Sequence, residues 1–466
     1  MYKRQLQLTY IFFDILSALI VWTLFLFFRR AIIDFQWLGE HYNIVIPNYD
    51  FYSSLWIFPI CCLFIHILSG VYLHPDKHRQ LKLFSTTLIA SAIIAAAVSF
   101  ALVHGDVRVS SEYYYQALFV LWFLLFGVTY FFRAIICANV RRKYKTGKWT
   151  TRTAIIGTGE NAKKIAREIA KNMPENTLLG YIAENKYAQK TENILGKLPQ
   201  IDAIIQKENI QEIIIAPDDS DEKKIFSIVN SLYSHDITIR FTPSLYDILI
   251  GGVKMHELGV SPLVTITNSS MSDWEACVKR FFDITVSFVA LILLLPLFLF
   301  LAVCIKMDSK GTVFFRQERI GQFGKAFNIL KFRTMRTNAE NGIPQLSTAD
   351  DSRVTRFGRF LRKYRLDELP QFWNVLKGEM SIVGPRPERA FYIKKIMEIA
   401  PYYCLVYKVR PGLTSWGPIR IGYSNTVEQM VERLNYDIIY IENMSLTTDL
   451  KILLFTIEVI FRGKGV

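Results

Sequence analysis

The sequence lacks the cysteine pairs that build disulfide frameworks and zinc sites. Its 466 residues include 6 cysteines and 7 histidines, and no two cysteines stand in a Cys-x-x-Cys spacing. Most of the cysteines lie in apolar stretches, where this residue behaves as a small hydrophobic side chain. The composition therefore excludes a small disulfide-stabilised protein and predicts no cysteine metal site.

Two further absences narrow the class of protein. The chain is basic, with 55 Lys and Arg against 41 Asp and Glu, as nucleic-acid-binding proteins are. It has no single basic helix and no zinc-finger spacing, so we predict no nucleic-acid partner. It also lacks the matched, interrupted apolar segments that are typical of transporters.

Long apolar runs are abundant instead. The chain is 51% hydrophobic, with a mean hydropathy of +0.22. Basic clusters at 3–4, 77–82 and 141–148 fit cytoplasmic helix ends. We therefore predict a transmembrane region of four helices, residues 1–140, that returns the chain to the cytoplasm. The four runs, each long enough to span a bilayer, are 6–28, 51–73, 81–103 and 113–138.

Ionisable residues are few within these runs, and Asp14 and His66 stand out. Such residues inside a membrane are functional candidates. We interpret both as structural, with Asp14 near a membrane interface and His66 hydrogen-bonded inside the bundle.

A second domain, residues 141–270, has the pattern of a Rossmann-like α/β fold. Gly157, Gly159 and Ala162 form a G-x-G-x-x-A spacing between a predicted strand and a predicted helix. This spacing is typical of dinucleotide-binding turns, which makes Gly157 and Gly159 candidates for nucleotide binding. Glycines that only pack the sheet are the alternative. Further parallel strands are predicted over 178–185, 212–219 and 237–243.

A fifth apolar run, 281–307, opens the third domain, residues 271–466. Basic residues flank both ends of the run, which indicates that both ends lie on the cytoplasmic side. Pro296 stands in its middle and would bend a helix there. We predict a re-entrant membrane helix, with an ordinary kinked span as the alternative.

The adjacent carboxylates Asp367 and Glu368 lie in a stretch rich in arginine. Helical spacing of the apolar residues after them predicts a helix that starts near Asp367. A helix start attracts phosphate, and an aspartate there can attack phosphorus and form an aspartyl phosphate. The alternative is that the pair only caps the helix.

The motifs around this pair resemble those of the bacterial polyprenyl-phosphate sugar-1-phosphate transferases, also called phosphoglycosyl transferases. KFRTM at 331–335 precedes the pair, and GPRP at 384–387 and VRPGLTSW at 409–416 follow it. The resemblance covers about residues 275–466. It implies a mostly α-helical (α+β), membrane-associated catalytic domain with a re-entrant helix, in a bacterial inner (cytoplasmic) membrane and facing the cytoplasm.

The resemblance also implies the reaction. A sugar 1-phosphate would pass from a UDP-sugar to undecaprenyl phosphate, releasing UMP, as the first membrane step of surface polysaccharide synthesis. Asp367 would be the nucleophile, and Glu368 would bind a metal or activate the acceptor. Mg²⁺ suits such a site, because it binds through one or two carboxylates plus phosphates, here Asp367 and Glu368. The oligomeric state is left open, a homodimer included.

Cations must neutralise a diphosphate before an anionic nucleophile can reach it. Lys331 and Arg333 would face one side if they lie on a strand, and Pro385 and Pro387 would rigidify the loop that carries Arg386. The candidates for phosphate contacts are Lys331, Arg333, Arg365, Arg386 and Arg410.

One segment departs from the family pattern, and two other classes of protein are alternatives. After RPGLT the family usually continues Gly-Leu-Trp-Gln-Val, whereas this chain has Ser415 and then Gly417-Pro418. The alternatives are a membrane-anchored nucleotide-sugar dehydratase or epimerase and a non-enzymatic nucleotide-sensing scaffold. The first needs a Tyr-x-x-x-Lys spacing downstream of the glycines, but the only one, Tyr144–Lys148, lies upstream.

Overall fold

The structure is a computed structural model. It describes residues 2–29, 49–77, 80–105, 111–173, 176–184, 193–216, 222–232, 235, 237–241, 264–265, 271–336, 351–422 and 426–461. The chain forms two compact units, Met1–Lys148 with Ser272–Val278, and Trp149–Met271 with Lys279–Val466. The predicted division into three domains at 140 and 270 stays a prediction.

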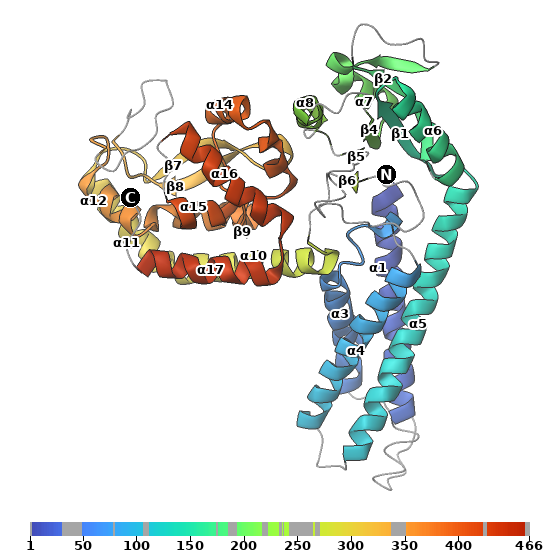
Figure 1. Cartoon of the computed structure of the whole chain (residues 1–466). Helices are drawn as coiled ribbons and strands as arrows, with labels where there is room; N and C mark the ends of the chain where they lie inside the picture. Colours follow the sequence, from blue (N-terminus) through green and yellow to red (C-terminus); the bar gives the residue numbers. More distant parts are fainter. Residues whose placement is uncertain are drawn as a thin grey trace. The chain divides into compact units, whose positions relative to one another are not determined.

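The first unit is a bundle of apolar helices that pack against one another (Figure 1). Three of them, α1, α4 and α5, are long and apolar enough to cross a membrane. The described apolar part of α3, residues 53–68, is shorter than the ~20 residues that a span needs. The protein is thus a membrane protein, and a fourth N-terminal span stays a prediction. The helices are α1 (Tyr2–Phe28), α3 (Tyr49–Leu68), α4 (Gln80–Gly105) and α5 (Ser111–Lys145), with a short 3₁₀ helix η2 (Pro75–Lys77).

Asp14 lies at the middle of α1, with its carboxylate enclosed by the bundle. Arg133 of α5 donates to both carboxylate oxygens, from Nε at 2.9 Å and from Nη2 at 2.7 Å. The Tyr72 hydroxyl also donates to Asp14, and Arg133 donates to Thr87 at 2.9 Å. Among the described residues, Nδ1 of His66 has no hydrogen-bond partner, so the predicted bond of His66 is not seen at this atom.

The α/β domain confirms the predicted parallel sheet. Five parallel strands lie in the order β3-β2-β1-β4-β5, and a short antiparallel β6 follows. This is the strand order of the Rossmann fold. Residues 185, 217–219 and 242–243 of the predicted strands lie outside the described residues. The elements are β1 (Thr151–Ile156), α6 (Glu160–Asn172), β2 (Asn176–Ala183), β3 (Ile194–Lys197), η3 (Leu198–Gln200), α7 (Ile201–Glu208), β4 (Glu212–Ile215), α8 (Glu222–Leu232), β5 (Thr238–Phe241) and β6 (Val264–Thr265).

Packing of the sheet is enough to require glycine at position 157. Gly157 has φ +124°, and a Cβ there would lie 2.3 Å from the carbonyl oxygen of Ala216. Its N–H donates to the carbonyl of Ile182 at 3.1 Å, and Glu160 places a carboxylate in the first turn of α6. An acidic first turn opposes phosphate binding. Nucleotide binding by Gly157 and Gly159 therefore stays a prediction.

The fifth apolar run forms a broken helix. α10 (Asp273–Leu293) and α11 (Leu295–Asp308) meet at an angle of 61°. Pro296 is in the first turn of α11, where its missing N–H costs no helical bond. The predicted break at Pro296 is thus confirmed, whereas re-entry stays a prediction.

The remaining chain combines short helices with two small sheets. The antiparallel hairpin of β7 and β8 packs against the 3₁₀ helix η5, and β9 pairs with β10 in parallel. The elements are β7 (Phe314–Ile320), η4 (Gln322–Gly324), β8 (Ala326–Phe332), α12 (Arg356–Lys363), η5 (Leu366–Gln371), α13 (Phe372–Lys377), β9 (Ser381–Val383), α14 (Ala390–Ile399), η6 (Pro401–Lys408), β10 (Gly412–Thr414), α15 (Trp416–Ile421), α16 (Val427–Glu442) and α17 (Leu446–Phe461).

Candidate active site

The carboxylate pair lies on a 3₁₀ helix. We expected an α-helix to start near Asp367, but η5 occupies this stretch and the α-helix begins only at Phe372. Arg365 precedes η5 with φ +54°, a left-handed conformation that is uncommon for a residue with a side chain. This sharp turn after α12 directs the backbone so that Asp367 and Glu368 are both buried, at 7% and 5% exposure.

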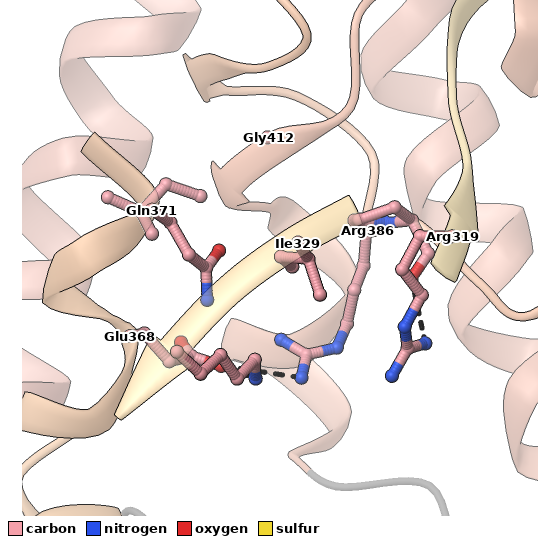
Figure 2. A pocket seen from close by; sticks show the side chains of 9 residues that line it. Arg319, Ile329, Glu368, Gln371, Arg386 and Gly412 are labelled. Atoms are coloured by element: carbon pink, nitrogen blue, oxygen red, sulfur yellow. Dashed lines mark hydrogen bonds and ion pairs between the residues drawn. The ribbon is translucent and has the colours of Figure 1, made fainter. Parts of the chain in front are cut away.

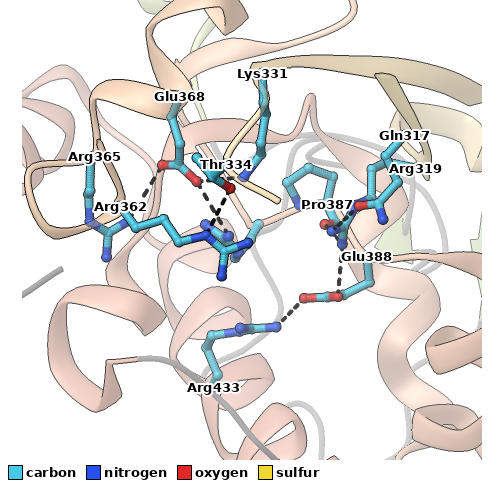
Figure 3. Close-up of polar contacts among 11 residues, drawn as sticks. Gln317, Arg319, Lys331, Thr334, Arg362, Arg365, Glu368, Pro387, Glu388 and Arg433 are labelled. Carbon is cyan, nitrogen blue, oxygen red and sulfur yellow. Dashed lines mark hydrogen bonds and ion pairs between the residues drawn. The ribbon is translucent and has the colours of Figure 1, made fainter. Parts of the chain in front are cut away.

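Glu368 is surrounded by cations. Lys331 Nζ lies 2.8 Å from its Oε1, Arg386 lies 3.5 Å from the same oxygen, and Arg365 lies 3.6 Å from Oε2. Figure 3 shows Lys331 of β8 and Arg365 of the turn before η5 beside the carboxylate, and Figure 2 shows Arg386 of the loop after β9. The structure thus brings together four of the predicted residues, which are distant in the sequence.

Asp367 differs from Glu368 in its partners and in the direction of its pKa shift. Among the described residues, its carboxylate has no hydrogen-bond or ion-pair partner within bonding distance. Burial, with Glu368 beside it, raises the pKa of Asp367 although Lys331 opposes the shift. Lys331, Arg386 and Arg365 overcome the effect of burial on Glu368 and hold its pKa well below the usual range. The pair therefore has one carboxylate whose charge is stabilised by three cations, and one with a raised pKa and no partner among the described residues.

The GPRP loop is fixed by its backbone. The carbonyl of Pro385 accepts from Gly412 N at 2.9 Å, and that of Pro387 accepts from Arg319 at 3.1 Å. A Cβ on Gly412 would lie 2.2 Å from the backbone nitrogen of Gly384, so only glycine allows this approach. These contacts aim Arg386 at Glu368.

A buried charge network behind this loop was missed in the sequence. Glu388 pairs with Arg319 at 3.3 Å and also with Arg433 of α16. Burial lowers the pKa of Arg319 to about 10, so it stays charged at neutral pH. These residues lie far apart in the chain and share no spacing, so no sequence signal could have joined them.

Asp437 of α16 connects this network to the segment that departs from the family pattern. It accepts from Ser415 Oγ at 2.9 Å, and from the backbone nitrogens of Gly417 and Arg386 at 3.4 Å. Burial raises the pKa of Asp437 to about 6. A Cβ on Gly417 would lie 2.3 Å from Cγ of Arg433, so the Ser415–Gly417 sequence fits close packing against α16.

Two predicted phosphate-binding residues lie elsewhere in the structure. β8 ends at Phe332, so Arg333 does not continue the strand and share a side with Lys331. It donates instead to the carbonyls of Ser309 at 2.7 Å and Lys310 at 3.0 Å, at the end of α11. Arg410 lies near Arg280 and Asp283. The structure brings neither of them to Glu368, and their contact with phosphate stays a prediction.

A small hollow opens beside Glu368 (Figure 2). Its cations are Lys331, Arg319 and Arg386, and its neutral polar side chain is that of Gln371. Sequence analysis did not single out Arg319 or Gln371. A basic hollow of this kind favours an anionic ligand.

The carboxylates fit Mg²⁺ only together with a ligand that brings more oxygens. Among the described residues no group of three or more His, Cys, Asp or Glu side chains could hold a metal ion. Asp367 and Glu368 supply carboxylate oxygens, which Mg²⁺ prefers, and substrate phosphates commonly complete its shell. The donor set thus suits a metal that enters with the substrate.

Comparison with known proteins gives two family matches. The family described as "Bacterial sugar transferase" matches residues 274–463, which include α10 from its second residue and every residue that lines the hollow. The family described as "CoA-binding domain" matches residues 68–243, which include the parallel sheet up to β5.

Three relatives with named activities match between 49% and 91% of the chain. A UDP-glucose:undecaprenyl-phosphate glucose-1-phosphate transferase of Klebsiella pneumoniae is 32% identical over 91% of this chain and 92% of its own length. The protein of the same name from Escherichia coli (strain K12) is 33% identical over 58% of each chain. A UDP-N-acetylgalactosamine-undecaprenyl-phosphate N-acetylgalactosaminephosphotransferase of Aeromonas hydrophila is 38% identical over 49% of this chain and 53% of its own length.

Proposed function

The chain belongs to the bacterial sugar transferase family, and we propose that it transfers a sugar 1-phosphate from a UDP-sugar to undecaprenyl phosphate. The names of its relatives support this donor and this acceptor. The product would be an undecaprenyl-diphosphate sugar, the lipid on which a surface polysaccharide such as an exopolysaccharide, capsule or O-antigen begins. No observation favours a dehydratase, an epimerase or a scaffold.

The main observation in support of this chemistry is the difference in ion pairing between the two adjacent carboxylates. Glu368 is neutralised by three cations, whereas Asp367 is buried without a partner among the described residues. A carboxylate without hydrogen bonds to hold it is a better nucleophile than a paired one. The surplus of cations can receive the charge of a diphosphate.

The proposed reaction has two steps. An oxygen of Asp367 attacks the β-phosphorus of the UDP-sugar, and the bond from that phosphorus to the bridging oxygen breaks, so UMP leaves with the electron pair. A phosphate oxygen of undecaprenyl phosphate then attacks the same phosphorus and displaces Asp367. Lys331 and Arg386 stabilise the charge on the phosphoryl oxygens in both steps.

Mg²⁺ is part of this proposal. Asp367 and Glu368 would hold it together with the diphosphate, and its charge would lower the repulsion between the nucleophile and the substrate. Because the site has few protein ligands, we expect weak binding of the metal without substrate. Chelation by EDTA should abolish turnover, and added Mg²⁺ should restore it.

Release of UMP tests the function. The purified protein, in detergent with undecaprenyl phosphate, is incubated with a panel of UDP-sugars that includes UDP-glucose and UDP-N-acetylgalactosamine. We expect UMP, together with a lipid-linked diphosphate sugar, from at least one donor. Absence of UMP with every donor, from a well-folded protein, would overturn the proposal.

The proposed function requires the site to face the cytoplasm, where UDP-sugars are made. The 61° break between α10 and α11 supports a helix that enters and leaves by one face. Single cysteines near 275 and 310, in a cysteine-free background, should both resist a membrane-impermeant thiol reagent outside intact cells. Both should react once the cytoplasmic side is opened. Labelling of position 310 from outside would show a true span instead.

A further inference from the structure

Gln371 is a buried amide that the proposed reaction steps do not use. It is the last residue of η5 and its side chain is only 2% exposed. Its Nε2 is fully buried and has no hydrogen-bond partner among the described residues. Figure 2 shows the side chain lining the hollow that also holds Glu368 and Arg386.

A second buried amide in the same segment shows what a purely structural role requires. Asn374 is also 2% exposed, but its amide is fully used. Nδ2 donates to the carbonyl of Asn328 at 2.8 Å and to Glu379 at 2.7 Å, while Oδ1 accepts from Leu330 N at 3.0 Å. A buried polar group without such partners costs free energy, so the open donor of Gln371 needs another explanation.

The rest of the hollow indicates what the missing partner is. Glu368 already forms ion pairs with three cations, and the carbonyl of Pro387 accepts from Arg319. Lys331, Arg319 and Arg386 make the hollow basic, so the ligand group beside them is an anion rich in acceptor oxygens. In the proposed substrate that group is the diphosphate.

We infer that Gln371 is a substrate-binding residue whose side-chain N–H donates to a phosphoryl oxygen of the nucleotide diphosphate. This rests on the proposed function. Because Gln371 and the carboxylate pair share one short 3₁₀ helix, the same backbone segment would position the nucleophile and the donor. A neutral donor orients the phosphoryl group without adding to the charge that the cations already supply.

The test replaces Gln371 by methionine, which has a similar length and no donor. We expect kcat/KM for UMP release to fall on the order of 10- to 100-fold, as for loss of a hydrogen bond to a charged group. We expect the Tm in detergent to stay unchanged or to rise, because an unsatisfied buried donor has been removed. Gln371→Glu, isosteric but without the donor, should also lose activity.

Asn374→Leu is the matched control. It removes a satisfied amide, so its Tm should fall, because Leu330 N, Asn328 and Glu379 lose their partner. A Gln371→Met variant that loses Tm as Asn374→Leu does would show a structural role and overturn the inference. A variant that keeps its kcat/KM would overturn it as well.

Binding of UDP separates this inference from the proposed function. UDP should raise the Tm of the wild-type protein, and Gln371→Met should show a clearly smaller rise. An equal rise in the two proteins would overturn the role of Gln371, whether or not the wild-type protein turns over. A wild-type protein that binds UDP but releases no UMP from any donor would overturn the proposed function and leave the contact of Gln371 standing.

Discussion

Two buried clusters, one around Asp14 in the helical bundle and one around Asp367 and Glu368 on η5, differ in how completely their carboxylates are paired. Asp14 is 2% exposed and accepts from Arg133 and Tyr72, so its carboxylate is fully occupied. Asp367 is 7% exposed and has no partner among the described residues, although Lys331 and Arg365 lie close by.

The difference shows which cluster stabilises the protein and which is available for chemistry. In the bundle, the side chains of Asp14, Arg133, Tyr72 and Thr87 are all hydrogen-bonded to one another, and such a satisfied network makes the packing of its helices specific. A network that leaves a buried carboxylate and a buried amide unsatisfied lowers stability, and such violations are typical of functional sites. We therefore expect mutations in the two clusters to separate stability from activity.

The largest effect should follow from Asp367→Asn. The change is nearly isosteric and removes the nucleophile, so UMP release should fall by several orders of magnitude. The Tm should stay the same or rise, because an unpaired buried charge is lost. Turnover and Tm are measured on the same detergent-purified sample.

Glu442→Gln is the control for Asp367→Asn. Glu442 is a half-exposed carboxylate paired with Lys408 at 3.0 Å, and neither residue lines the hollow. Its turnover should match that of the wild-type protein. Near-normal turnover of Asp367→Asn would remove Asp367 from the role of nucleophile.

The opposite pattern should follow from Arg133→Met in the bundle. The change leaves the buried Asp14 carboxylate without its cation, which commonly costs about 3–5 kcal/mol. For a unit of this size the Tm should fall on the order of 10 °C. Turnover per folded molecule should change little, since the proposed chemistry uses no residue of the bundle.

A double variant sharpens this second prediction. Asp14→Leu together with Arg133→Met removes both charges and should recover much of the lost Tm, because no buried charge remains unpaired. If the double variant is as unstable as Arg133→Met, the Asp14–Arg133 pair stabilises the bundle by more than the neutralisation of its two charges. If Arg133→Met abolishes turnover without unfolding, the bundle takes part in the reaction.

The sequence predicted what lies close together in the chain. The carboxylate pair, the proline break at 296 and the parallel sheet all rest on local patterns, namely adjacent acids, one proline in an apolar run and a glycine spacing before a helix. The structure confirms the break and the sheet. The role of Asp367 stays a prediction.

What could not be predicted depends on where a strand ends or on contacts between distant segments. Arg333 was expected beside Lys331, but β8 stops one residue before it. Glu388, Arg433 and Asp437 meet only because α16 packs behind the GPRP loop. Gln371 belongs to the stretch at the centre of the prediction, yet nothing in its spacing shows that its amide is left unpaired.

The smallest effect, and the one that compares the two carboxylates directly, should appear in the pH dependence. Only the ionised form of Asp367 can attack phosphorus, and burial raises its pKa above the usual 3.8. Activity should therefore decline as the pH falls through this raised value. The pKa of Asp437 is also raised, so its protonation could cause the same decline. If an Asp437→Asn variant keeps the pH dependence of the wild-type activity, the decline belongs to Asp367.

Stability should respond with the opposite sign. Because the folded pKa of Asp367 lies above the unfolded one, its contribution to stability is fully present below pH 3.8 and is lost as the pH rises through the folded value. Asp367→Asn cannot ionise and escapes this loss, so its Tm should exceed that of the wild-type protein by a margin that grows from acidic to neutral pH.

The folded pKa of Glu368 is lowered, so its contribution to stability is present above the unfolded pKa. Glu368→Gln should therefore be less stable than the wild-type protein at neutral pH. If the Tm difference between Asp367→Asn and the wild-type protein is the same at all pH values, the pKa of Asp367 is not raised in the folded protein.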